Sequence, residues 1–373
     1  MRIGFYGKYG RPVTGRTLEE SGCGGSESAL IYMARELHQL GNEVFVFNRC
    51  GNARGNYDGV EYLDISEFPP FLEAGKTLDI LVIFRDLDVL KVLQPDTSAI
   101  GIKRKVYWAH DDTSFLWNNP KVMQEVGNWL NERTDRIFAV SNWQAGIYTE
   151  KFGVKKEKIF VTRNGINLDL FKGDVKREPG RLIYTSVPDR GLDILVDIFP
   201  EIKKRTGAEL YVFSSFKVYG TPETDEKLKD IFDQAKSEGV HVMEPMPQKD
   251  LAKELLRSKL MVYPNHPATF HPVFAETACI AVLEAQAAGT PVITSDRGAL
   301  PESVLDGETG ILIDGDPYSA EYKTRFIEAA ADLLKNEEEW ARLSRSGRER
   351  IRKEYPWAKI AGEWLEEFNR ILR

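Results

Sequence analysis

The chain has 373 residues, enough for two domains of ordinary size. Hydrophobic residues make up 42% and charged residues 29%, which is typical of a globular protein with a packed core, and 11% aromatic residues argue against intrinsic disorder. The formal net charge of −7 lacks the basic footprint of a nucleic-acid-binding protein, so we expect no nucleic-acid partner.

Three features bear on the cellular location of the chain. No window approaches the roughly 18 to 20 apolar residues of a transmembrane helix, and the apolar start, Arg2 to Tyr6, is too short for a signal peptide. The cysteines, Cys23, Cys50 and Cys279, are odd in number and widely spaced, which is typical of neither a disulfide scaffold nor a zinc cluster. We therefore predict a cytoplasmic protein. No clear basic amphipathic helix is present, which leaves peripheral membrane association open.

Short β-branched runs alternate with longer amphipathic stretches along most of the chain. Helices are predicted at 26–40, 192–206 and 225–238, and the first carries apolar residues on one face at helical spacing. Strands are predicted at 2–6, 43–47, 79–84, 105–108, 136–140, 159–162, 181–185, 209–213, 259–263 and 290–294. Strands separated by helices predict parallel sheets that are covered on both faces.

The pattern is interrupted between Asn164 and Pro179, where turn formers and charges gather. We therefore predict an α/β protein with two Rossmann-like domains that face each other across a cleft, residues 1–170 and 171–355. The last segment, residues 356–373, carries tryptophans at helical spacing and is expected to pack as a helix on the N-terminal domain.

Two glutamates, Glu276 and Glu284, are separated by seven residues and precede a predicted strand. If the segment is helical, eight steps rise about 12 Å and return to within about 80° of the start, so both carboxylates can hold one elongated ligand. A helix that begins at Glu276 would offer the backbone N–H groups of Thr277, Ala278 and Cys279 to a phosphate. The carboxylates would then accept hydrogen bonds from sugar hydroxyls. Two ordinary glutamates on a solvated helix are the alternative.

The surrounding sequence resembles retaining GT-B glycosyltransferases of family 4, the group 1 type. In that family a Glu-x7-Glu pair is followed by a turn like Glu284 to Val292 and by a stretch like Gly298 to Leu312. Val140 to Phe171 resembles the end of the family's first domain, with Asn167 where aspartate is usual, and Gly22 to Phe47 resembles its glycine-rich loop and first helix. The resemblance covers nearly the whole chain in the family's order.

The resemblance implies a retaining, metal-independent glycosyltransferase that moves a sugar from a nucleotide-sugar donor to a glycan, lipid or protein. It implies no cofactor, since the nucleotide-sugar is a substrate. The donor would lie on the second domain, with Glu284 on the ribose and Glu276 on the sugar hydroxyls, and the first domain would bind the acceptor. Base contacts are expected near Met243 to Gln248.

Arg190 lies in a segment, Ser186 to Leu195, that resembles the family's cationic stretch. An arginine there would hold the diphosphate in bidentate fashion and neutralise the charge of the leaving group. Thr185 occupies the position of the family's second cation. Another side chain or helix dipoles would have to replace that charge.

His110 matches the histidine that the family places beside the donor sugar, and we predict it, with Glu276 and Arg190, as catalytic. The adjacent Asp111 and Asp112 are candidates to orient its ring or to cap the next segment. In the glycine-rich loop, Gly24 and Gly25 let backbone N–H groups approach a phosphate or an acceptor closely.

Other patterns in the sequence are weaker indications of a functional site. Asp86 and Asp88 form a D-x-D pair that is expected to begin a helix rather than to hold a metal. His266 and His271 lack a third ligand at standard spacing, so no metal site is predicted. Two functional alternatives remain: a nucleotide-sugar epimerase or hydrolase of the same fold, and a non-catalytic subunit that binds sugar nucleotides.

Overall fold

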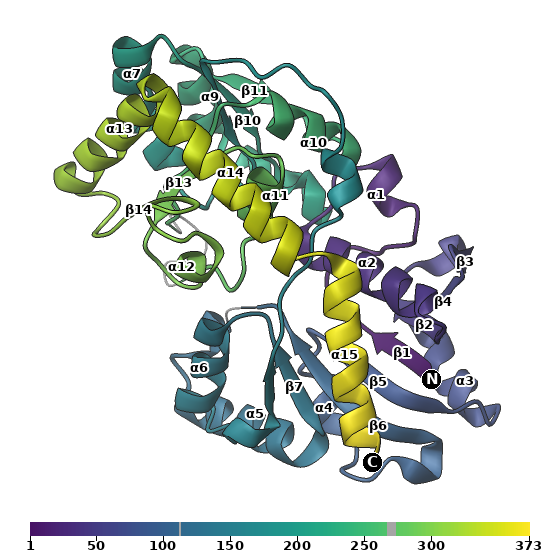
Figure 1. The fold of residues 1–373 in the computed structure, drawn as a ribbon. Coiled ribbons are helices and arrows are strands. Elements are labelled where there is room, and N and C mark those ends of the chain that lie inside the picture. Colours follow the sequence, from purple (N-terminus) through teal and green to yellow (C-terminus); the bar gives the residue numbers. More distant parts are fainter. Residues whose placement is uncertain (112, 267–273) are drawn as a thin grey trace. The chain divides into compact units, whose positions relative to one another are not determined.

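The computed structural model describes residues 1–111, 113–266 and 274–373, and the chain forms two compact units (Figure 1). Unit 1 consists of Met1–Thr17, Ser26–Gly165 and Trp357–Arg373, and unit 2 consists of Leu18–Gly25 and Ile166–Pro356.

Unit 1 is built on an eight-stranded sheet of order β3-β4-β2-β1-β5-β6-β7-β8. All neighbouring strands are parallel except the antiparallel pair β3 and β4. The strands are β1 (Arg2–Tyr6), β2 (Glu43–Asn48), β3 (Gly55–Tyr57), β4 (Val60–Asp64), β5 (Leu78–Phe84), β6 (Ile102–Ala109), β7 (Arg136–Ala139) and β8 (Ile159–Val161). The helices are α2 (Gly25–Gln39), α3 (Phe68–Glu73), α4 (Val89–Val92), α5 (Pro120–Arg133), α6 (Asn142–Glu150) and α15 (Trp357–Leu372). The short helix α1 (Thr17–Glu20) begins at the last residue of the first segment of unit 1, and its residues 18–20 belong to unit 2.

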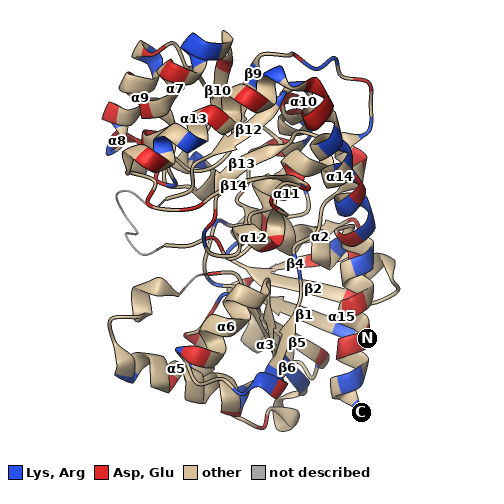
Figure 2. Ribbon diagram, turned by 60° about the vertical axis from the view of Figure 1, so that its left-hand side comes forward, with Lys and Arg blue, Asp and Glu red and all other residues tan. Residues whose placement is uncertain are grey.

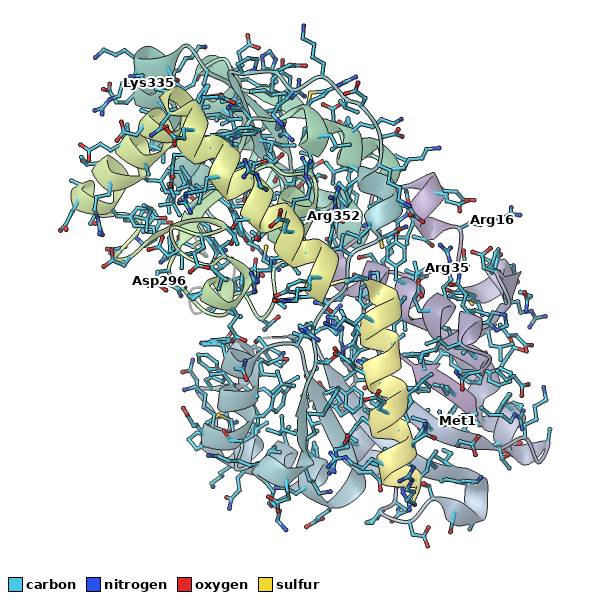
Figure 3. The ribbon with its side chains drawn as sticks, viewed as in Figure 1. Met1, Arg16, Arg35, Asp296, Lys335 and Arg352 are labelled. Atoms are coloured by element: carbon cyan, nitrogen blue, oxygen red, sulfur yellow. The ribbon has the colours of Figure 1, made fainter. Side chains whose placement is uncertain are left out.

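Unit 2 is built on a six-stranded parallel sheet of order β11-β10-β9-β12-β13-β14. The strands are β9 (Arg181–Tyr184), β10 (Glu209–Phe213), β11 (His241–Met243), β12 (Leu260–Tyr263), β13 (Val292–Ser295) and β14 (Gly310–Ile313). The helices are α7 (Leu192–Thr206), α8 (Glu223–Glu226), α9 (Lys229–Ser237), α10 (Gln248–Arg257), α11 (Ile280–Ala287), α12 (Leu300–Ser303), α13 (Ala320–Lys335) and α14 (Glu337–Glu354). Figure 3 labels Lys335 where α13 ends and Arg352 near the end of α14.

Charged side chains lie mostly on helices and loops, and the strands are mostly uncharged (Figure 2). Parallel sheets are covered by helices on both faces, so most side chains of the inner strands are buried. Strand β12, for example, is buried along its whole length.

The C-terminal helix α15 belongs to unit 1 and lies alongside its sheet (Figure 1). Trp364 packs edge-on against Trp108 and Phe138, with ring centroids 4.6 and 4.7 Å apart, and its indole N–H donates to Thr162 Oγ1 at 2.8 Å. The buried aromatic face of this helix therefore completes the core of unit 1.

The chain leaves unit 1 at Gly165, a few residues before the boundary expected near residue 170. Ile166 is already held by unit 2, since its backbone N–H donates to the carbonyl of Tyr355 at 2.7 Å and its side chain is buried against Leu283 and Ile351. The segment Leu18–Gly25 also clusters with unit 2, which the predicted division did not include.

Candidate functional site

The sheet of unit 2 has a topological switch point between β9 and β12. These two strands are neighbours, and the order of the sheet runs outward from them in opposite directions along the chain. Ligands of open α/β sheets bind outside the carboxyl ends of the strands at such a point. Arg190 follows β9 and Glu276 follows β12, so the fold brings these two predicted residues to one edge. Asp296, labelled in Figure 3, follows β13.

Glu276 is the centre of a hydrogen-bonded cluster at this edge. Its Oε1 accepts from Arg190 Nη1 at 3.1 Å and from the Tyr263 hydroxyl at 2.5 Å. The Tyr263 oxygen in turn accepts from Asn265 Nδ2 at 2.8 Å. Glu276 is only 4% exposed, so its carboxylate is held in one place by charge-assisted bonds. Tyr263 and Asn265 were not among the predicted site residues, because nothing in their local sequence marks them.

Arg190 is oriented by several groups. Its guanidinium lies over the Phe274 ring, 4.3 Å from the centroid, in addition to its ion pair with Glu276. Burial alone would lower the pKa of Arg190, but the nearby oxygens of Tyr219 and Glu276 outweigh burial and raise it above its ordinary value. The side chain is therefore a fixed, charged group at the start of α7.

The helix that carries Glu284 begins later than predicted. Helix α11 starts at Ile280 with Cys279 as its N-cap residue, so the expectation that it begins at Glu276 is wrong. The Glu276 carbonyl accepts from the backbone N–H of Ala299 at 2.8 Å, which holds this stretch outside the helix. The N–H groups of Thr277, Ala278 and Cys279 are therefore not those of the first helical turn.

Glu284 lies within α11 and is 7% exposed. Its Oε1 accepts from Gln248 Nε2, the first residue of α10, at 2.6 Å. Burial raises the pKa of Glu284 to about 7, and the Gln248 hydrogen bond opposes that shift. Gln248 closes the stretch predicted to contact the base.

The raised pKa predicts how stability depends on pH. Between the ordinary pKa of 4.5 and about 7, folded Glu284 retains a proton that the unfolded chain has lost. The contribution of Glu284 to the free energy of unfolding is therefore fully present below pH 4.5. It is lost as pH rises toward 7 and beyond, and the loss is on the order of 3 kcal/mol. Urea unfolding at pH 5 and pH 8 should show a larger loss of stability in the wild type than in Glu284→Gln.

A matched control for this measurement is Glu201→Gln, on the exposed side of α7, where Arg205 donates a hydrogen bond to the carboxylate. This variant should keep the pH-dependent loss seen in the wild type. Equal pH dependence in the wild type and in Glu284→Gln would show that Glu284 does not titrate in this range.

The glycine-rich loop lies within unit 2, together with α11. Gly24 is buried, and a Cβ built on Gly25 would stand 3.3 Å from Ile280 Cδ1 at the start of α11. A Cβ on Gly22 would stand 3.1 Å from Pro245 Cβ. The glycines thus allow a close approach of the backbone to the helix that carries Glu284 and to the stretch before α10.

His110 lies in unit 1, directly after β6, and is buried. Its ring packs edge-on against Trp108 and Phe84, with centroids 4.5 and 5.1 Å away. Burial, with a smaller effect of the Arg85 charge, lowers its pKa well below the ordinary value, so the imidazole is neutral. The Asp111 carboxylate pairs with Arg85, and Asp112 lies outside the described residues.

The remaining residues weighed as metal ligands make contacts within the protein. Asp86 accepts from the backbone N–H of Val89 at 3.1 Å, and Asp88 is the N-cap residue of α4. His266 packs edge-on against Tyr318, and His271 lies outside the described residues. Across the part of the chain that is described, no group of three or more His, Cys, Asp or Glu side chains could hold a metal ion. Nor does any helix in that part have the length and hydropathy to cross a membrane.

Thr185, where the resemblance implies a cation, is buried directly after β9. Arg297 is a cation that the sequence analysis did not single out. It follows β13, and its Nη2 donates to the Phe274 carbonyl at 3.1 Å, so it reaches the residue on which Arg190 stacks.

Comparison with known families agrees with this geometry. Residues 182–350 match the model "Glycosyl transferases group 1", and residues 23–170 match "Glycosyltransferase Family 4". The chain belongs to the group 1 glycosyltransferases of family 4. The enzyme class predicted from the sequence, a glycosyltransferase, is therefore confirmed.

Individual relatives of this glycosyltransferase are distant. It is 26% identical to alpha-maltose-1-phosphate synthase of Mycolicibacterium smegmatis over 271 residues, which cover 66% of this chain and 67% of that protein. It is 29% identical to D-inositol 3-phosphate glycosyltransferase of Streptomyces scabiei over 204 residues, 49% of this chain and 44% of that protein. The chain thus spans less than half of the second relative.

Solved structures agree in fold. HepE of Anabaena in complex with UDP-glucose superposes with a TM-score of 0.75 at 15% identity and covers 99% of this chain and 100% of that one. WaaG, described as a glycosyltransferase involved in lipopolysaccharide biosynthesis, gives a TM-score of 0.66 at 13% identity, covering 99% of each chain. The predicted GT-B fold class, with two Rossmann-like domains, is confirmed by these structures and by the topology of the two sheets.

Proposed function

We propose that this glycosyltransferase moves a sugar from a nucleotide-sugar donor to a hydroxyl-bearing acceptor, with retention at the anomeric carbon and without a divalent metal. The observation that carries the proposal is the cluster of Arg190, Glu276 and Tyr263 at the switch point of unit 2. A buried carboxylate held beside a guanidinium suits a ligand that presents hydroxyls next to a phosphate.

The roles follow from the chemistry of the groups. Arg190 would neutralise the diphosphate as it leaves, and Glu276 would accept hydrogen bonds from the sugar hydroxyls. Glu284 would bind the ribose hydroxyls, and the N–H groups at the start of α11, beside Gly24 and Gly25, would bind phosphate oxygens.

The reaction develops positive character at the anomeric carbon as the carbon–oxygen bond to the nucleotide breaks. A phosphate oxygen of the departing nucleotide can take the acceptor proton on the face from which it leaves. That arrangement places the acceptor on the same face and retains the configuration. Unit 1 would hold the acceptor, and the neutral imidazole of His110 would take the role that the family resemblance implies, beside the donor sugar.

Similar proteins support a nucleotide-sugar as the class of donor. HepE is described in complexes with UDP, with UDP-glucose, and with UDP and glucose. A relative from Mycobacterium tuberculosis, 25% identical over 295 residues, is named a GDP-mannose-dependent mannosyltransferase. UDP-glucose and GDP-mannose are both nucleoside diphosphate sugars, which supports that class of donor.

The three cysteines are all free, which supports the proposed cytoplasmic location.

A thermal-shift panel of UDP, GDP, ADP, TDP and CMP tests the donor site. A nucleotide at a hundred times its Kd stabilises the folded protein by about 2.7 kcal/mol, which gives a measurable rise in Tm. We expect one nucleoside diphosphate to raise the Tm of the wild type, and Arg190→Ala to lose that rise.

The control is Arg205→Ala, which removes an arginine from the exposed side of α7 and should keep the rise. An equal rise in Arg190→Ala and in the wild type would contradict the diphosphate role of Arg190. Donor consumption that requires no acceptor would favour an epimerase or hydrolase instead, and an isolated chain that binds but never turns over its donor would favour a non-catalytic subunit.

A further inference from the structure

The sheet of unit 1 has a switch point of its own, between β1 and β5. These strands are neighbours, with β2 and β4 continuing on one side and β6 to β8 on the other. Ligand-binding residues of open α/β sheets gather outside the carboxyl ends of the strands at such a point. The first residue beyond β5 is Arg85.

Arg85 has an unusual backbone. Its φ is +61°, and only two other non-glycine residues of the described chain, Asp58 and Thr113, have a positive φ. The left-handed conformation costs a residue with a side chain about 1 to 2 kcal/mol. Strain of this kind persists where the surrounding structure demands it and is concentrated at functional sites.

The guanidinium of Arg85 joins two other segments of the chain. Its Nη2 donates to Asp111 Oδ1 at 2.7 Å, and its Nε lies 3.1 Å from both Asp111 oxygens. Its Nη1 donates to Glu27 Oε1 at 3.2 Å, near the start of α2. The Glu27 side chain is 3% exposed and that of Arg85 is 20% exposed, so the bond between them is largely shielded from water, whereas the Asp111 side chain is 34% exposed.

Asp111 directly follows His110 and is held at two places. Arg85 fixes its carboxylate, and the buried Gln144 fixes its backbone by donating from Nε2 to the Asp111 carbonyl at 2.9 Å. Gln144 Oε1 accepts from the Val140 backbone N–H at 2.9 Å, which ties it to the end of β7. The peptide that carries His110 is therefore anchored to both neighbouring strands.

We propose that Arg85 is a positioning residue of the transfer reaction, which fixes His110 at the end of β6 by binding Asp111 and Glu27. The proposal rests on the function proposed above for His110. A lysine cannot replace this arginine fully, because its single ammonium cannot bridge the Asp111 carboxylate and Glu27 with the same planar fork. The positive charge of Arg85 also lowers the pKa of His110, in addition to the effect of burial.

Two substitutions separate positioning from a purely structural ion pair. Arg85→Asn removes the guanidinium, while asparagine tolerates the left-handed backbone. Arg85→Lys keeps the positive charge but lacks the planar guanidinium group with its several N–H donors. The matched control is Arg2→Asn, which removes an ion pair with Glu43 elsewhere in unit 1.

Two readouts are needed. The first is the titration of the His110 ring by NMR of protein labelled at histidine, assigned with His110→Asn, and it needs no ligand. The second is kcat for release of UDP or GDP from UDP-glucose and GDP-mannose with D-glucose as acceptor, measured together with Tm.

We expect Arg85→Asn to lower Tm, because Glu27 and Asp111 lose their partner, to shift the His110 titration to higher pH, and to lower kcat at least tenfold even at temperatures well below that Tm. Arg85→Lys should recover only part of kcat, and Arg2→Asn should match the wild type in both readouts. The proposal is overturned if Arg85→Asn leaves the titration of the His110 ring unchanged. This holds both when kcat is unchanged and when kcat falls only in step with Tm. A wild type that transfers no sugar would count against the proposed function, and the His110 titration would still decide the role of Arg85.

Discussion

Replacing Glu276 with glutamine should lower kcat by a factor on the order of 10² or more, while the protein stays folded. Glutamine has the same shape, and its amide oxygen can still accept from Arg190 and Tyr263, but it lacks the charge that we propose to orient sugar hydroxyls beside the developing cation. Steady-state rates of nucleotide release and the Tm of the same preparation measure the two effects separately.

The matched control is Glu254→Gln, which changes another largely buried glutamate of unit 2. Glu254 pairs with Arg181 and Arg257 and is not at the carboxyl edge of the sheet. This variant should lose stability without a comparable loss of kcat. If Glu276→Gln turned over its donor at the wild-type rate, the assignment of Glu276 to the reaction would be wrong.

Replacing Gly191 with alanine should lower stability by about 2 to 5 kcal/mol and abolish the nucleotide-dependent rise in Tm. The backbone of Gly191 has φ +98°, and a Cβ there would stand 1.9 Å from the Pro264 carbonyl oxygen. The left-handed backbone costs about 1 to 2 kcal/mol, and the clash adds about 1 to 3 kcal/mol because a backbone atom cannot rotate away. Relief of the clash would move the start of α7 away from the end of β12, and with it the adjacent Arg190 from Glu276.

Gly207→Ala provides the control at the other end of the same helix, α7. Gly207 also has a positive φ, +70°, but a Cβ there would meet no atom within 4 Å. Its substitution should cost only the backbone strain and leave nucleotide binding intact. Equal losses in the two variants would show that strain alone, rather than contact with Pro264, requires glycine at 191.

The position of the glutamate pair shows where prediction from the sequence reached its limit. With seven residues between the two glutamates, the sequence predicted one continuous helix from Glu276 to Glu284, but Glu276 precedes α11. The hydrogen bond from Ala299 to the Glu276 carbonyl decides this, and the two residues are far apart in the sequence. No local pattern could have indicated that bond.

The broken helix at 225–238 has a similar explanation. The sequence predicts one helix, and the structure has α8 and α9, with Leu228 buried between them. Periodicity indicates which face of such a stretch is apolar. It does not indicate at which residue such a stretch is interrupted.

The sequence by itself determined the fold class, several elements and the family. Helix α7 has the predicted bounds, Leu192–Thr206, and strand β10 has the predicted bounds, Glu209–Phe213. These elements depend on neighbours within a few residues, so their periodicity is visible in one sequence. Only the tertiary structure brought Arg190 to Tyr263 and Glu276, or Arg85 to Glu27 and Asp111. Those contacts depend on the order of strands in each sheet, which places the ends of distant segments together, and local sequence does not encode that order.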